Sequence, residues 1–122
     1  MKRVIIVDDD SFFAELVSAI VQKLGYFAIV CFRIEDALEL VKKTEVRFII
    51  TDIFMPGMGG IEGIKKLRAG FPKIKIVAMS GGWSTMSPDD TVKAATKTGA
   101  DAGLKKPFSA DDLAEVLKTL GI

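Results

Sequence analysis

Short apolar runs alternate along this chain with stretches whose apolar residues recur at helical spacing, and this alternation constrains the possible fold most strongly. The runs are short, rich in β-branched residues and bounded by turn signals, so we expect them to be strands. They lie at Val4–Val7, Ala28–Phe32, Phe48–Ile50, Ile74–Met79 and Ala102–Leu104. Strands joined by helical crossovers pair in parallel, and right-handed crossovers place helices on both faces of the sheet. The sequence therefore predicts an α/β fold with a doubly wound parallel sheet.

Five helices are expected between and after these strands. Apolar periodicity marks the first three, at residues 13–24, 34–41 and 61–67, and Gly25 is expected to end the first. Ser87-Pro88-Asp89-Asp90 carries the residues preferred at the first positions of a fourth helix. Ser109, followed three residues later by Asp112, is expected to cap the last helix.

The composition is that of one compact domain. The chain has 122 residues, of which 49% are apolar, and its net charge is +1. This length supports one hydrophobic core, so we expect a single domain over residues 1–122 with no output domain in this chain. The small net charge gives no general attraction to nucleic acid or to a membrane surface. No apolar segment has the length of a membrane span, and the stretch after Met1-Lys2-Arg3 is too short for a signal peptide.

The single cysteine, Cys31, lies in the second apolar run. It has no second cysteine with which to form an internal disulfide, and a thiol in a strand is expected to be buried and inert. Together with the lack of a membrane span or signal peptide, this predicts a reducing, cytoplasmic setting.

Polar residues follow four of the apolar runs at the point where each is expected to end. They are Asp8-Asp9, Asp52, Ser80 and Lys106-Pro107. The carboxyl ends of parallel strands lie along one edge of a sheet, and ligands bind at that edge. Carboxylate oxygens suit Mg²⁺, while a lysine and a serine hydroxyl can each donate to a phosphoryl oxygen. The sequence therefore predicts a divalent metal site with a phosphoryl group beside it.

Most of these residues also have an ordinary structural explanation. Asp8, Asp9 and Asp10 could simply cap the helix that follows, because aspartate favours N-caps, and Asp10 is expected to do so. Ser80 could be a loop residue, and a lone lysine is commonly a surface residue. Asp52 is different, because it ends an apolar strand before a turn signal and has no helix to cap.

Four segments, taken in order, resemble the receiver domain of two-component response regulators, which has the flavodoxin-like fold of the chemotaxis regulators. They are Val7-Asp8-Asp9-Asp10, the segment from Thr51 to Gly60, Ser80-Gly81 and Lys105-Lys106-Pro107-Phe108. The resemblance covers nearly the whole chain. It implies a flavodoxin-like (βα)5 sandwich with strands in the order 2-1-3-4-5 and a site between strands one and three.

The resemblance also implies roles for the acidic residues. Asp52 would accept a phosphoryl group from a phosphohistidine on a histidine kinase or a histidine phosphotransfer protein. Asp9, Asp52 and the main-chain carbonyl of Phe54 would hold Mg²⁺, and Asp8 would act mainly through water. The 122 residues contain no histidine, so the donor is expected to lie outside them.

The remaining site residues would carry the switch. Lys106 would pair with Asp52 or with the phosphoryl group, its peptide bond to Pro107 would be cis, and Ser80 would move to bind a phosphoryl oxygen. The signal would pass through the segment after Ser80, and through the face of the fourth helix, fifth strand and fifth helix, to an unidentified protein target. The family usually has an aromatic residue three positions before the lysine, but here that residue is Gly103. We therefore expect the response to run through Gly81-Gly82 toward Trp83.

Two other functions stay open on the sequence alone. One is a Mg²⁺-dependent phosphatase with an aspartyl nucleophile, since Asp8 and Asp10 have the spacing of a nucleophile and its general acid. The other is an interaction module of the same fold that is not phosphorylated. As a receiver the chain would be a phosphoacceptor and not an enzyme, with at most self-phosphorylation and self-dephosphorylation.

Overall fold

The computed structural model describes residues 2–53, 60–80, 93, 97 and 99–122. The strands are β1 (Arg3–Val7), β2 (Phe27–Cys31), β3 (Phe48–Asp52), β4 (Lys75–Ser80) and β5 (Ala102–Lys105). The helices are α1 (Ser11–Lys23), α2 (Ile34–Lys43), α3 (Gly60–Gly70) and α5 (Ala110–Thr119). The expected helix start at Ser87 lies outside the described residues, although Lys93 and Lys97 are helical. None of the described helices is long and apolar enough to cross a membrane.

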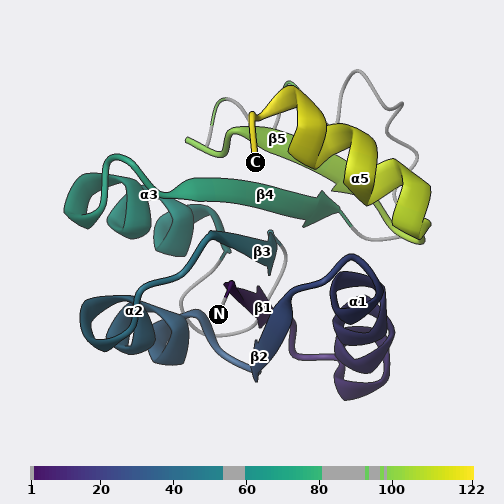
Figure 1. The fold of residues 1–122 in the computed structure, drawn as a ribbon. Coiled ribbons are helices and arrows are strands. Elements are labelled where there is room, and N and C mark those ends of the chain that lie inside the picture. Colours follow the sequence, from purple (N-terminus) through teal and green to yellow (C-terminus); the bar gives the residue numbers. More distant parts are fainter. Residues whose placement is uncertain (1, 54–59, 81–92, 94–96, 98) are drawn as a thin grey trace.

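All five strands are parallel and follow the order β2-β1-β3-β4-β5. Helices α2 and α3 lie on one face of the sheet and α1 and α5 on the other (Figure 1). This is the predicted flavodoxin-like arrangement. After β1 the chain forms β2 on one side of it, whereas β3 lies on its other side. The switch point, where the strand order reverses and where ligands bind in this class of fold, therefore lies between β1 and β3.

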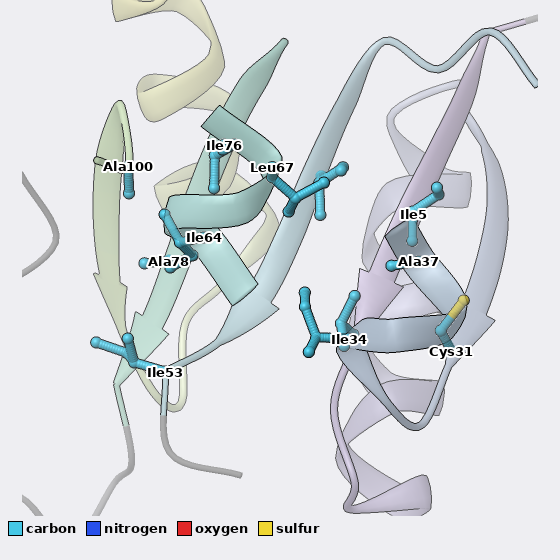
Figure 2. Packing of buried hydrophobic residues seen from close by; sticks show 12 residues of the cluster. Ile5, Cys31, Ile34, Ala37, Ile53, Ile64, Leu67, Ile76, Ala78 and Ala100 are labelled. Atoms are coloured by element: carbon cyan, nitrogen blue, oxygen red, sulfur yellow. The ribbon is translucent and has the colours of Figure 1, made fainter. Parts of the chain in front are cut away.

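The central strands β1, β3 and β4 are mostly apolar because both of their faces are buried. Along β1, Ile5 and Val7 face the core under α2 and α3, whereas Val4 and Ile6 face the core under α1 and α5. Figure 2 shows the first of these cores, where Ile64 and Leu67 of α3 lie near Ile76 of β4. Two cores, one on each side of the sheet, therefore hold the site-bearing strands in place.

The predicted strands are correct in number and order but differ from the structure at their ends. Strand β2 begins and ends one residue earlier than expected, which leaves Phe32 outside the sheet and 52% exposed. Strand β3 extends two residues further, through Thr51 and Asp52. Because β3 is a central strand, its partners continue the ladder on both sides, pairing Thr51 with Val7 and Asp52 with Met79. Asp52 is therefore a strand residue with a fixed backbone.

Helix ends follow the sequence signals. Gly25 comes after α1 with a φ of 96°, a left-handed conformation that glycine adopts without steric cost. At α5, Ser109 accepts a hydrogen bond from the Asp112 backbone N–H, and Asp112 accepts one from the Ser109 backbone N–H. This reciprocal cap confirms the predicted start of the last helix.

Candidate functional site

The carboxyl ends of β1 and β3 bring three acidic residues together. Asp8 follows β1 directly, and its backbone N–H donates to the carbonyl of Cys31 over 3.1 Å. Asp52 is the last residue of β3. Asp8, Asp9 and Asp52 each offer a carboxylate oxygen, and these oxygens lie within 4.8 Å of one another. The structure thus brings together the acids that the sequence analysis singled out.

The three acids differ in burial. Asp8 is 0% exposed and Asp52 is 6% exposed, whereas Asp9 is exposed to solvent. Two buried carboxylates so close together repel each other unless a cation lies nearby. A cluster of carboxylate oxygens that opens to water at Asp9 has the donor chemistry of a site for a hydrated Mg²⁺.

Lys106 supplies a positive charge to this cluster. Its ammonium donates to Asp8 Oδ2 over 2.7 Å and to Asp52 Oδ2 over 2.9 Å. The lysine side chain is only 11% exposed. Burial alone would lower the pKa of Lys106, but the hydrogen bonds to Asp52 and Asp8 and the charges of both carboxylates outweigh it. The pKa of Lys106 therefore lies above its ordinary value, and the lysine is charged at neutral pH.

The turn between β1 and α1 separates the roles of the first three acids. The second oxygen of Asp8, Oδ1, accepts from the Asp10 backbone N–H over 3.0 Å. Asp10 in turn accepts from the Phe13 backbone N–H over 3.2 Å and is the N-cap of α1. Asp10 is thus a helix cap, as predicted, and Asp8 is held in place by the backbone on one side and by Lys106 on the other.

Two contacts of Lys106 were missed from the sequence. Its pairing with Asp52 was expected, but the shorter contact to Asp8 was not. The Phe13 ring also lies against the ammonium, 4.6 Å from ring centroid to Nζ, although periodicity had indicated only a core residue of the first helix. The contact to Asp8 depends on how the ends of β1 and β5 lie relative to each other, and the contact to Phe13 depends on how α1 lies beside the end of β5. The Lys106-Pro107 peptide is cis, in agreement with the expectation.

The other candidate residues are only partly described. Ser80 is the last residue of β4, and its backbone pairs with that of Lys105 next to the site. Gly103 lies in β5 opposite Ala78, so no aromatic side chain occupies that strand position. Phe54, Gly81-Gly82 and Trp83 lie outside the described residues.

The strand order, the acids at the β1/β3 switch point and the lysine after β5 define a flavodoxin-like domain of the receiver class. A sequence model of the response regulator receiver domain matches residues 4–118. The chain belongs to this family. Family membership implies a phosphoacceptor role in two-component signalling, and receiver domains are signalling domains and not conventional enzymes.

Individual relatives agree with this assignment. The chain is 34% identical over 117 residues to the chemotaxis protein CheY of Thermotoga maritima, covering 95% of this chain and 94% of that protein. It is 32% identical over 120 residues to the transcriptional regulatory protein DegU of Brevibacillus brevis, of which it spans only 49%. Among solved structures, chemotaxis protein CheY4 of Vibrio cholerae aligns with a TM-score of 0.83 at 28% identity, covering 98% of both chains.

Proposed function

We propose that this receiver domain accepts a phosphoryl group on Asp52 from a phosphohistidine of a partner protein. The observation that carries the proposal is the contact of the Lys106 ammonium with Asp52, 2.9 Å away, inside a cluster of three carboxylates. A carboxylate is a weak nucleophile, so it needs a donor with a good leaving group and cations that offset the charge of the transferred group. Lys106 is one such cation.

In the proposed step, an oxygen of Asp52 forms a bond to phosphorus while the bond from phosphorus to the donor imidazole nitrogen breaks. The electron pair of the broken bond stays on that nitrogen. Lys106 would exchange a carboxylate contact for a phosphoryl oxygen, and the Ser80 hydroxyl would donate to another oxygen of the group. Membership of the receiver family favours a histidine kinase or a histidine phosphotransfer protein as the donor, and the 122 residues contain no histidine that could serve instead.

Mg²⁺ would be held by Asp9 and Asp52 together with the carbonyl of Phe54, with Asp8 acting mainly through water. When bound, the ion would supply positive charge to the oxygens of the transferred group. The contacts of Asp8 support the indirect role, since one of its oxygens accepts from Lys106 and the other from the Asp10 backbone.

The aspartyl phosphatase alternative is less well supported. It requires Asp8 as nucleophile and Asp10 as general acid. Asp10 instead accepts the hydrogen bond that caps α1, and Asp8 is fully buried and paired with Lys106. Because Asp52 is also buried and paired with Lys106, it is the capping role of Asp10 that disfavours the phosphatase.

The proposal is tested by incubating the protein with Mg²⁺ and either acetyl phosphate or phosphoramidate, and then measuring the intact mass. Phosphoramidate carries the same phosphorus–nitrogen bond as phosphohistidine. We expect the wild type to gain one phosphoryl group and Asp52→Asn to gain none. Asp111→Asn, an exposed acid in the first turn of α5, is the matched control and should behave as the wild type.

A wild type that gains no phosphoryl group from either donor, while binding Mg²⁺, would favour the interaction module. An equal gain in Asp52→Asn would place the acceptor elsewhere. Steady hydrolysis of a small phosphate ester that persists in Asp52→Asn but is lost in Asp8→Asn would favour the phosphatase.

A further inference from the structure

The Lys106 ammonium is enclosed on three sides. It has three N–H donors, and two of them are directed at Asp8 Oδ2 and Asp52 Oδ2, 2.7 and 2.9 Å away. The Phe13 ring faces the ammonium at 4.6 Å, within the distance at which a ring attracts a cation. Because the lysine side chain is only 11% exposed, the ring occupies a direction that water would otherwise hydrate.

The Phe13 ring is held from two separate parts of the chain. At its own backbone, the Phe13 N–H donates to the Asp10 carboxylate, and the Asp10 N–H donates to Asp8. At its other side, Phe108 meets the ring edge to face, with centroids 6.1 Å apart and planes at 81°. Phe108 is 9% exposed and lies two residues after Lys106. The ring is therefore fixed relative to both the acids and the lysine.

We propose that Phe13 is a positioning residue that confines the Lys106 ammonium to the space between Asp8 and Asp52. An aliphatic side chain could fill the same space, but it would offer no ring face to the cation. The confined ammonium would already lie beside Asp52 when a phosphoryl group arrives, so that less motion is needed to reach the transition state. This last step rests on the proposed function, whereas the confinement of Lys106 does not.

The first measurement tests the confinement without any phosphoryl donor. Protons held over a ring face resonate upfield, so the Lys106 ε-methylene protons should be shifted upfield in the wild type. The shift should be lost in Phe13→Leu and kept in Phe13→Tyr, which retains the ring. Phe12→Leu makes the same change at the preceding residue, which is 71% exposed, and should leave the shift unaltered.

The second measurement is the rate of phosphorylation by acetyl phosphate with Mg²⁺. Phe13→Leu loses one partly desolvated cation–ring contact, so its rate of phosphorylation should fall by about fivefold. Phe13→Tyr and Phe12→Leu should stay near the wild-type rate. If Phe13 acts through the lysine, adding Phe13→Leu to Lys106→Met should slow the reaction no further, because the contact is already gone.

Two outcomes would overturn the proposal. One is an unchanged ε-methylene shift in Phe13→Leu. The other is an equal slowing by Phe13→Leu with and without Lys106, which would mean that the ring acts on the fold and not on the lysine. A wild type that takes no phosphoryl group at all would instead refute the proposed function, and the shift comparison would still decide whether Phe13 confines Lys106.

Discussion

At the scale of single residues, Lys106 is the cation that, among the described residues, pairs with both buried acids. Its removal leaves Asp8 and Asp52, both almost fully buried, without their cation. We expect Lys106→Met to lower the free energy of unfolding by about 3 kcal/mol in the absence of Mg²⁺. Urea titration would measure the loss, and Mg²⁺ should restore part of it. Lys105→Met, the same change at the exposed neighbour, should have little effect, and equal losses in the two variants would contradict this account.

Cys31 gives a prediction about pH. Burial, with a smaller contribution from the charge of Asp36, raises the pKa of the Cys31 thiol from 9.0 to about 11. A group whose pKa is raised by folding stabilises the protein fully below its unfolded pKa and loses that contribution as the pH rises through its folded pKa. Between pH 8 and pH 11 the wild type should therefore lose roughly 2 kcal/mol more unfolding free energy than Cys31→Ala. Urea titrations at several pH values would measure the unfolding free energy of both proteins. If it falls by the same amount in the two, ionisation of the Cys31 thiol does not cause the loss.

At the scale of elements, the contact between α2 and α3 requires a glycine. A Cβ atom on Gly63 would collide with the branched side chain of Ile34 close to its backbone, where Ile34 has little freedom to yield. We expect Gly63→Ala to cost about 1–3 kcal/mol of unfolding free energy, because overpacking outweighs the better helix propensity of alanine. Gly70→Ala, in the same helix with open space around the new methyl group, is the control and should be neutral or slightly stabilising. Urea titration of both variants checks this, and equal effects would argue against a close packing contact.

Arg68 ties three segments together at the end of α3. Its guanidinium donates to the carbonyls of Gly99, Pro72 and Ile74 and pairs with Asp101, which also accepts from the Ile76 backbone N–H. These contacts, called the Arg68 clamp below, hold the segments that lead into β4 and β5. Those two strands end at Ser80 and just before Lys106.

A lysine cannot reproduce this planar fork of donors. We expect Arg68→Lys to cost about 2 kcal/mol of unfolding free energy, measured by urea titration, because several carbonyls lose their partner. Arg33→Lys is the matched control, since Arg33 is largely exposed and pairs with Glu35 at the surface, and it should leave the unfolding free energy nearly unchanged. A similar cost at both sites would mean that the fork geometry of Arg68 is unimportant.

At the scale of the whole molecule, metal binding should appear as stability. An ion that binds the folded state alone stabilises it, by about 1.4 kcal/mol at ten times its dissociation constant. We expect Mg²⁺ to raise the thermal midpoint of the wild type, and to raise it much less in Asp9→Asn, because the exposed acid of the cluster is the one most open to a hydrated ion. Asp111→Asn should respond to Mg²⁺ as the wild type does. An undiminished response in Asp9→Asn would remove Asp9 from the proposed ligands.

Much of this architecture could be predicted from local patterns. Apolar runs indicated the strands, and the resemblance to receiver domains implied their order in the sheet. The caps at Asp10 and Ser109 were recognised because capping involves groups only a few residues apart. The strand ends were less accurate, as at Asp52, because the ladder continues for as long as neighbouring strands supply partners. The candidate acids and Lys106 were found because each follows an apolar run.

By itself, the sequence determined the fold class, the family and which polar residues gather at the carboxyl edge of the sheet. Tertiary structure alone decided the contacts within that set. Asp8 and Lys106 are 98 positions apart, and their pairing depends on how β1 and β5 end relative to each other. The Phe13 ring beside Lys106, the Arg68 clamp and the fit of Gly63 against Ile34 likewise arise where elements distant in sequence meet. Local patterns reflect forces between near neighbours along the chain, whereas these contacts exist only after both cores have packed against the sheet.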